Sequence, residues 1–382
     1  MKKAPEKSHY LLIITVILCY SVVGVSFGAL PVILINEERF SHLTLGVVIG
    51  SYAFTAIPSR IVGGFLMNKF GYRNFLIIAA FILSASTSLV LLASSPAHFL
   101  LTRLCLGIGV GFMMSVTTAW IVDLPTNTGL ASKLGSIGTL NYLVLAFGAP
   151  LGAYVSNIYD GRQTLFLSSI LPLLGAIISF KIHNPKPKKR RGTRKAFIME
   201  AFKISFLPGV VLMTSGFGYA SIVSFGVDVA KYKNLAWPGA VVFTFGFVMV
   251  SSRIFITKYI ERYKESAICS LFFMLEALGL GIISYFKNFL LIILGTSLVA
   301  LGMAFIYPFL GKIVAYSASN DVRGTALAIF GSFINLGIGI GSILLGGIAS
   351  ISNVAASFGF AAFITSFGAL AYFLKTSNKH TS

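Results

Sequence analysis

Charged residues are scarce in this sequence: they make up 11% of its 382 residues, and only 11 of them are acids. Soluble globular domains usually contain about 25% charged residues. Apolar residues instead make up 56% of the chain. This composition excludes an ordinary soluble protein and is typical of a chain that lies mostly within a membrane.

Cysteine and histidine are also scarce, with three and five residues in the whole sequence. The cysteines lie in apolar runs at separations that match neither a disulfide framework nor a metal site. The histidines lie at the ends of apolar runs, in loops or in the tails. No Ser/His/Asp set and no carboxylate pair shares one depth. We therefore predict no metal, no cofactor and no enzyme activity.

Long apolar runs occupy most of the remaining chain. From Tyr10 to Leu374 they follow one another, each about 20 residues long, which is enough to cross a hydrocarbon core. They lack the alternation of a membrane barrel, so we expect helices. The first run is too long for a signal peptide. The expected spans are 10–34, 43–67, 74–93, 97–121, 134–156, 163–181, 204–229, 238–257, 266–285, 288–313, 324–349 and 354–374.

Basic residues are distributed unevenly between the connections of these spans. When the connections are assigned alternately to two sides, most lysines and arginines fall on the side of the termini. The other side holds only Arg39, Arg162, Lys231, Lys233 and Lys287. Because basic residues concentrate on the cytoplasmic side of membrane proteins, we predict a multi-pass inner-membrane protein with both termini in the cytoplasm.

The longest polar connection contains a basic run from Lys186 to Arg191. Such a run, with a net charge of +19, suggests nucleic-acid binding when it is considered alone. Beside a membrane, however, each basic residue gains about 1 kcal/mol from anionic lipid headgroups. We therefore predict contact with anionic lipid headgroups at this linker and no nucleic-acid partner.

A constant offset of 193 residues relates the two halves of the chain. It holds without gaps from the second to the fifth span, and repeats of this kind are common in transporters. We predict two six-helix halves, 1–181 and 204–382, joined by the linker 182–203 and related by a pseudo-twofold axis. The offset pairs Ser59-Arg60 with Ser252-Arg253, and Gly109, Gly138 and Gly148 with Gly302, Gly331 and Gly341.

Three short motifs resemble signatures of the major facilitator superfamily. The loop from Gly64 to Arg73 is similar to G-x-x-x-D-R-x-G-R-[KR], with Asn68 in place of the Asp and Tyr72 in place of one of the basic residues. The segment from Arg103 to Gly109 is similar to R-x-x-Q-G-x-G and lacks only the Gln. Gly148 to Gly152 resembles a degraded G-P-x-x-G-G. The resemblance covers essentially the whole chain and is closest to the proton-coupled efflux members.

The resemblance implies an all-α membrane protein of about twelve transmembrane helices in two six-helix bundles that works by alternating access. It also implies a cytoplasmic gate formed by Asn68, Arg73, Asp123, Glu261 and Arg262. We expect Arg73 and Asp123 to form a salt bridge in the outward-facing conformation. Asn68 lacks the charge that an Asp offers to a helix N-terminus, typically about 0.3–1 kcal/mol.

Few ionisable groups fall within the predicted spans, where they are costly and functional by default. Asp228 lies near the outer end of the seventh span and Glu276 near the middle of the ninth. Both are candidates for proton coupling; the alternatives are a residue at a helix mouth for Asp228 and a protonated packing residue for Glu276. Arg103 lies in a glycine-rich helix, about two turns inside the outer face of the membrane. It is the best single candidate for function.

The remaining candidates form a wall that is polar through amide, hydroxyl and aromatic groups. Such a wall suits an amphipathic or weakly polar solute. Ordinary helix packing is the alternative role for each residue. Beside Arg103, the predicted substrate-binding residues are Phe27, Met114, Asn141, Tyr142, Tyr219, Phe225, Tyr307 and Asn335.

The sequence thus predicts a monomeric secondary transporter of a small solute. The leading hypothesis is proton-coupled efflux of drug-like compounds or metabolites, driven by the transmembrane proton gradient. The first alternative is proton-coupled or facilitated uptake of a sugar, organic acid or other nutrient. The second is a membrane receptor or scaffold that does not transport.

Overall fold

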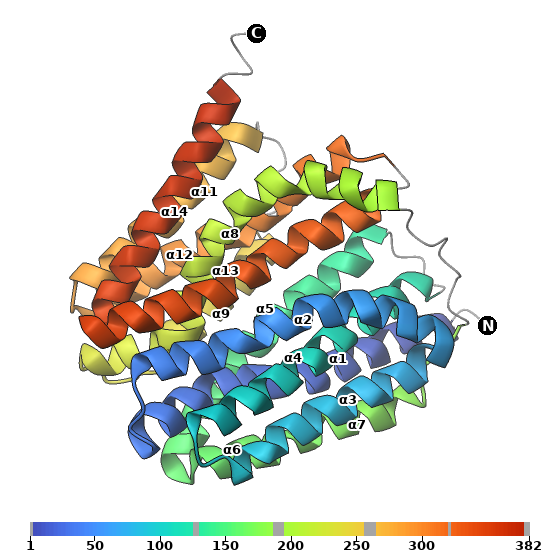
Figure 1. Ribbon diagram of the computed structural model, residues 1–382, viewed down its shortest axis with the longest axis horizontal. Coiled ribbons are helices and arrows are strands. Elements are labelled where there is room, and N and C mark those ends of the chain that lie inside the picture. Colours follow the sequence, from blue (N-terminus) through green and yellow to red (C-terminus); the bar gives the residue numbers. More distant parts are fainter. Residues whose placement is uncertain (1–2, 125–129, 186–194, 256–264, 320–321, 378–382) are drawn as a thin grey trace. The chain divides into compact units, whose positions relative to one another are not determined.

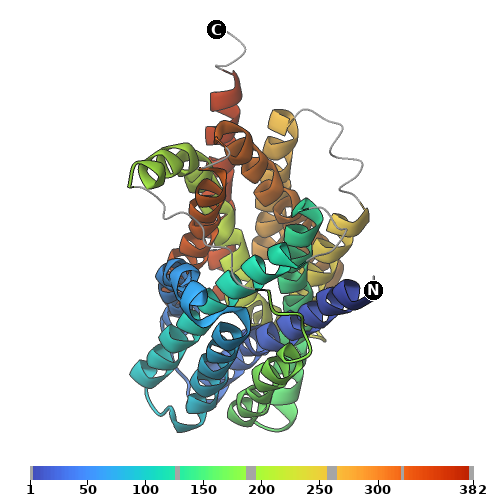
Figure 2. The same cartoon turned by 90° about the vertical axis from the view of Figure 1, so that its right-hand side faces the viewer.

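The structure is a computed structural model that describes residues 3–124, 130–185, 195–255, 265–319 and 322–377. Every regular element in these ranges is a helix. The chain divides into two compact units: residues 1–40 with 51–190 form unit 1, and residues 41–50 with 191–382 form unit 2. Within each unit long helices lie side by side, as Figure 1 and the turned view in Figure 2 show.

Unit 1 contains the first half of the chain, apart from the first residues of α2. Its elements are α1 (Lys3–Pro31), η1 (Val32–Glu37), most of α2 (His42–Phe70), α3 (Tyr72–Ser88), η2 (Leu89–Leu92), α4 (Pro96–Asp123), α5 (Leu130–Ile158), α6 (Gly161–Ser168) and α7 (Ile170–Ser179). Unit 2 contains α8 (Lys195–Tyr232), α9 (Ala240–Phe255), α11 (Glu265–Tyr285), α12 (Phe289–Ser317), α13 (Arg323–Ile351) and α14 (Val354–Ser377).

These helices are long and apolar enough to form a membrane protein. Among the described residues, eight stretches can span a bilayer, and α6 with α7 together form one of them, Gly161–Ser179. Four shorter apolar helices, Leu143–Ile158, Ala240–Phe255, Cys269–Tyr285 and Val354–Leu370, complete the set. The predicted all-helical membrane fold is confirmed.

The 193-residue offset reappears in the bounds of the helices. Moved by that offset, α5 (Leu130–Ile158) coincides at both ends with α13 (Arg323–Ile351), and the first residues of α3 and α4 coincide with those of α11 and α12. The capping residues also correspond. Ser95 accepts a hydrogen bond at the start of α4, as Asn288 does at the start of α12. A side-chain oxygen at an N-cap satisfies backbone N–H groups that have no partner within the helix.

Glycines set the distance between the helices that pack most closely. A Cβ atom on Gly28 of α1 would lie 1.8 Å from the carbonyl oxygen of Ala149 in α5. A Cβ atom on Gly216 of α8 would lie 2.7 Å from the Cα atom of Gly337 in α13. In each unit, small residues therefore bring two backbones into direct contact, which is the usual way in which membrane helices associate.

The Arg162 side chain at the start of α6 joins several segments of unit 1. Its Nη1 atom donates to the carbonyls of Val90 and Ala93, and its Nη2 atom forms an ion pair with Glu38. The guanidinium group also lies 5.4 Å from the centre of the buried Phe99 ring. These contacts hold the loops at one end of unit 1 together.

Replacing Arg162 with alanine is expected to lower the free energy of unfolding by about 1–3 kcal/mol, because half-buried carbonyls and a carboxylate lose their partner. The midpoint of thermal unfolding of the purified protein in detergent measures this change. Lys181→Ala, which removes an exposed lysine of the same unit, is the control. Equal midpoints for the two variants would show that the Arg162 contacts contribute no stability.

Candidate functional site

Arg103 lies in the interior of unit 1, with 2% of its surface exposed. Its Nη1 atom donates to the Ser26 hydroxyl at 2.9 Å. The guanidinium carbon lies 5.7 Å from the ring centre of Phe27 and 5.2 Å from that of Tyr52. Arginine over aromatic faces is a favourable arrangement worth about 0.5–2 kcal/mol. Three helices, α1, α2 and α4, thus form an aromatic box around one cation.

Glycine allows this close arrangement, as the motif around Arg103 suggests. A Cβ atom on Gly107 of α4 would lie 2.2 Å from the carbonyl oxygen of Tyr52 in α2. The hydroxyl of Thr55 in α2 donates to the carbonyl of Leu104 in α4 at 2.7 Å. The two helices are therefore held in contact directly beside the guanidinium group.

The charge of Arg103 is only partly compensated. Its Nε and Nη2 atoms have no hydrogen-bond partner among the described residues. A small cavity of ≈ 10 Å³ lies beside the side chain and is lined in part by Ser26, Thr87 and Thr102. A buried cation with unpaired donors is expensive unless a further partner is supplied. The cavity has room for about one water molecule, so a larger electron-rich group would reach the two free donors only after the surrounding helices repack.

Unit 2 carries no such cation at the equivalent place. The 193-residue offset relates Arg103 to Thr296, whose hydroxyl donates to the carbonyl of Ile292 in its own helix. The same offset holds between α1 and α8, because Gly24 packs against Gly148 as Phe217 packs against Gly341. It relates Ser26 and Tyr52 to Tyr219 and Phe245, whose rings meet edge to face at 5.7 Å. The Arg103 box is thus a feature of unit 1 alone.

Unit 2 has a buried ionisable group of its own, Glu276, at a position that is not equivalent to Arg103. Its side chain is fully buried in α11, and its Oε2 atom accepts a hydrogen bond from the Ser215 hydroxyl of α8 at 2.8 Å. Its Oε1 atom has no partner among the described residues. A Cβ atom on Gly218 would lie 2.1 Å from Oε1, so glycine at this position leaves the space that the carboxyl group fills.

The internal repeat shows that the residues around Glu276 differ together from their apolar equivalents in unit 1. Gly109 packs against Leu83 in unit 1, as Gly302 packs against Glu276 in unit 2. The offset relates Ser215, Gly218 and Glu276 to Val22, Val25 and Leu83, all of which are buried. Unit 2 therefore has a hydroxyl donor, a space and a carboxyl group where unit 1 has three apolar side chains.

No cation accompanies Glu276 on its own helix or on those that hold it. α8 has no charged residue between Lys203 and Asp228, α12 has none before Lys312, and α14 has none before Lys375. An ionised carboxylate in this apolar surrounding would be very costly. The neutral form of the carboxyl group is therefore the one that fits this surrounding.

Asp228 lies three turns further along α8 from Gly218, near the end of that helix. It is buried, with 6% of its surface exposed, and its Oδ2 atom has no hydrogen-bond partner within the described ranges. Lys231, one turn further along the same helix, interacts electrostatically with its carboxyl group. The structure places Asp228 and Glu276 in one unit and gives them separate surroundings.

The other predicted substrate residues are dispersed within their units. Phe27 joins Arg103, whereas Met114 lies three turns away along α4 and is half-buried. In unit 2, Phe225 is fully buried, Tyr307 lies 5.3 Å from the ring of Phe330, and the Asn335 amide donates to the Gly331 carbonyl of its own helix. The side chains of Asn141 and Tyr142 lie outside the described residues.

The predicted gate has different partners in this structure. Arg73 donates to the carbonyls of Ser179 and Ile182 at 3.2 and 2.8 Å, while Asp123 accepts from the Tyr72 hydroxyl at 2.6 Å. No Arg73–Asp123 salt bridge is present within the described ranges, because Arg73 binds one carbonyl at the end of α7 and one in the turn that follows it. The side chain of Asn68 and the residues Glu261 and Arg262 lie outside the described residues.

Sequence reasoning missed several residues that the structure brings into these sites. Tyr72 was treated as a departure from a motif, yet it binds Asp123 and stacks on Trp120 at 6.0 Å. Ser215 and Gly218 were not singled out. A comparison of buried positions across the 193-residue offset would have found them, because they change character together with Glu276.

The described residues contain no group of three or more His, Cys, Asp or Glu side chains that could hold a metal ion. All three cysteines are free, and Cys19 and Cys269 are buried. The site chemistry of the described part therefore rests on one cation, two carboxyl groups and aromatic surfaces.

The profile of the Major Facilitator Superfamily matches residues 12–275 and 233–382. The chain belongs to the major facilitator superfamily. An uncharacterized MFS-type transporter of Salmonella typhimurium is 24% identical over 329 residues, which cover 84% of each chain. Another from Methanocaldococcus jannaschii is 22% identical over 374 residues, which cover 94% of this chain and 95% of the relative.

Solved structures of other superfamily members share the fold. A variant of the nucleoside transporter NupG superposes with a TM-score of 0.82 at 14% identity, covering 96% of this chain and 99% of the other. The human organic anion transporter MFSD10 gives a TM-score of 0.70 at 15% identity, with coverage of 96% and 99%. This superfamily member is therefore a multi-pass membrane transporter.

Proposed function

We propose that this transporter exports a small amphipathic organic solute in exchange for protons by alternating access. The observation that carries the proposal is the asymmetric divergence of the internal repeat. Unit 1 contains a partly compensated cation in an aromatic box, and unit 2 contains a carboxyl group with a hydroxyl donor and a space of its own. Buried ionisable groups within a membrane are retained where they bind ions or substrates.

Arg103 provides the polar contact for the solute. Its planar group can bind a carboxylate or carbonyl oxygen through two parallel N–H donors, and two of its nitrogens have no partner among the described residues. The rings of Phe27 and Tyr52 present apolar surface beside these donors. The preferred solute therefore combines an aromatic or apolar body with one acceptor group.

Glu276 provides the proton site, and Asp228 is a second candidate. A neutral Glu276 fits its surroundings, whereas an ionised one would need water or a cation. Release of the proton therefore favours a different packing of α8 against α11. Such a two-state element can couple proton movement to a change of conformation, since a ligand shifts an equilibrium only through its different affinity for the two states.

The charge asymmetry of the connections supports an orientation with both termini in the cytoplasm. The expected gate belongs to that side: Arg73, Asp123 and Tyr72 hold the ends of α3, α4 and α7 together. We retain the salt bridge between Arg73 and Asp123 as a proposal for the outward-facing conformation. The predicted monomer and the lipid contacts of the basic linker are also retained as proposals.

Uptake of a nutrient is the second candidate function. The likeness to a nucleoside transporter motivates it, because the described helices superpose well on NupG. An aromatic box beside a guanidinium group would also suit a nucleobase carbonyl and its ring. Direction of transport distinguishes this function from export.

Flux into proteoliposomes tests the proposed function. Thermal-shift screening of the purified protein first selects solutes, since a ligand that binds the folded state raises its stability. Each selected solute is then offered to vesicles with an acidic, an alkaline or a matched lumen. Proton exchange predicts accumulation in the acidic lumen, because protons leaving the vesicle drive the solute inward.

The other outcomes contradict the proposal. Accumulation in the alkaline lumen would show proton symport and favour uptake. Equilibration that ignores the gradient would show facilitated transport. Binding without flux in any vesicle would indicate a receptor or scaffold.

A further inference from the structure

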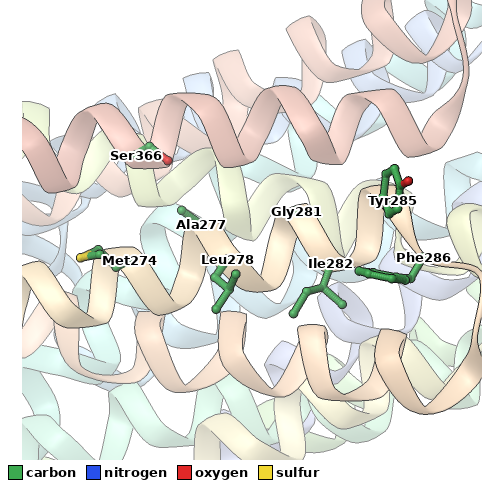
Figure 3. Close-up of a pocket in the computed structure, with 8 residues that line it drawn as sticks. All are labelled: Met274, Ala277, Leu278, Gly281, Ile282, Tyr285, Phe286 and Ser366. Carbon is green, nitrogen blue, oxygen red and sulfur yellow. The ribbon is translucent and has the colours of Figure 1, made fainter.

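A long apolar groove runs along α11 in unit 2 (Figure 3). It is a shallow depression, open on its outer side, with a volume of ≈ 470 Å³, and it is called the α11 groove below. The lining residues are Met274, Ala277, Leu278, Gly281, Ile282, Tyr285 and Phe286 of α11, with Ser366 of α14.

The α11 groove has the length of one leaflet. Its residues recur at spacings of three and four, so they form one stripe along the helix. The stripe from Met274 to Phe286 is about 18 Å long at 1.5 Å per residue. Half of a hydrocarbon core is about 15 Å. An extended acyl chain of one leaflet therefore matches the stripe.

Glycine opens the middle of the α11 groove. A Cβ atom added to Gly281 would meet nothing within 4 Å. Two residues earlier, on the opposite face of the helix, a Cβ atom on Gly279 would lie 2.3 Å from the Gly295 carbonyl oxygen of α12. One glycine thus serves helix packing, whereas the other leaves open space that no described residue fills.

The neighbouring helix borders the α11 groove without filling it. The Ser284 hydroxyl of α11 donates to the Ala355 carbonyl of α14 at 2.8 Å near one end. Near the other end, a Cβ atom on Gly368 of α14 would lie 3.0 Å from the Phe273 ring. These two contacts hold α14 against α11 near both ends of the groove.

Positive charge gathers where the α11 groove ends. Lys287 follows Phe286 directly and is exposed. Lys233 is buried, and its Nζ atom donates to the carbonyls of Ser284 and Phe286. Burial and the neighbouring Lys287 lower the pKa of Lys233 to about 8. The two ammonium groups therefore lie close enough to repel each other at the end of an apolar groove.

In the described chain next to Lys233 and Lys287, the only acid is Asp228. Its carboxyl group is buried and interacts electrostatically with Lys231 instead. Tyr285, with 82% of its surface exposed, lies between the apolar stripe and Lys287. Tyrosine at such a boundary is typical of the membrane interface. The apolar stripe, the tyrosine and the lysine therefore follow one another in the same order as the acyl chain, the glycerol region and the phosphate of a phospholipid.

We propose that the α11 groove binds one anionic phospholipid, with an acyl chain along the stripe and the phosphate at Lys287. Lys233 provides a second positive charge behind the phosphate. A lipid with a net negative headgroup is preferred, because a zwitterionic headgroup carries its own cation into a site that already holds two. The site lies within unit 2 and is separate from the basic linker.

Native mass spectrometry of the full chain tests this site. The protein is equilibrated in detergent with equal amounts of phosphatidylglycerol and phosphatidylcholine that carry the same acyl chains. We expect the wild-type monomer to retain one phosphatidylglycerol in preference to phosphatidylcholine. Lys287→Gln should lower that preference about fivefold, the effect of one basic residue near an anionic lipid.

Two further variants make the test specific. Gly281→Phe fills the open space and should remove the retained lipid of either headgroup, while thermal unfolding shows that the protein remains folded. Arg39→Gln removes an exposed basic residue of unit 1 away from the basic linker and should leave the preference unchanged. Equal retention of both lipids by the wild type, or equal losses from Lys287→Gln and Arg39→Gln, would overturn the proposal. A dimer that Gly281→Phe dissociates would overturn it too, by assigning the groove to a second copy.

Discussion

Replacing Arg103 with alanine is expected to reduce proton-driven solute flux to the level of protein-free vesicles. The guanidinium group is the charged contact that we propose for the solute, and alanine retains neither its charge nor its planar set of donors. Arg103→Lys should retain partial flux at best, because an ammonium group keeps the charge but loses the two parallel donors. Flux is measured in proteoliposomes reconstituted to equal protein density.

The same substitution should leave the protein folded. Two guanidinium nitrogens have no partner among the described residues, so removing Arg103 relieves an unpaired buried charge while losing the contacts to Ser26, Phe27 and Tyr52. We expect an unchanged elution volume in gel filtration and little change in the unfolding midpoint. Thr296→Ala alters the equivalent position of unit 2 and serves as the matched control with retained flux. Full proton-driven flux from Arg103→Ala would leave Arg103 a structural anchor.

Replacing Glu276 with glutamine is expected to abolish the response of solute flux to a pH gradient. Glutamine has the shape of the protonated side chain and can accept the Ser215 hydrogen bond, but it cannot release a proton. The carrier should therefore still exchange labelled for unlabelled solute across the membrane. Accumulation in acidic vesicles and exchange at matched pH are measured on the same preparation.

A triple variant separates the proton site from its packing role. Ser215→Val, Gly218→Val and Glu276→Leu together restore the apolar set that unit 1 has at Val22, Val25 and Leu83. We expect this variant to fold, because that set already packs in the equivalent place. It should lose accumulation as Glu276→Gln does. Normal accumulation by either variant would exclude Glu276 from proton coupling and leave Asp228 as the remaining candidate.

Each of the two sites could be predicted from the sequence only in part. Arg103 and Glu276 stand out because few ionisable residues occur in apolar runs. Their partners do not stand out. Ser26, Tyr52, Ser215 and Gly218 are ordinary residues for a membrane helix, and only the structure places them beside a cation or a carboxyl group.

The gate shows a further limit of the sequence. The resemblance of residues 64–73 to a family motif predicts a salt bridge between Arg73 and Asp123 in the outward-facing conformation, and this stays a prediction. In the structure the Tyr72 hydroxyl donates to Asp123, and Arg73 donates to the carbonyls of Ser179 and Ile182 at and just beyond the end of α7. A motif predicts which residues are polar and close, whereas local geometry decides which of several donors reaches each acceptor.

The sequence by itself determined that this protein lies in a membrane and that it is helical. It also determined where the spans lie and that the two halves repeat. Each of these depends on composition, run length or a constant spacing, which are local or periodic properties. The tertiary structure alone decided which faces meet. Helices that are apolar on all sides carry no stripe that indicates their rotation. Their contacts are set by glycines and small side chains that let particular backbones approach, as Gly107 does beside Arg103 and Gly218 beside Glu276.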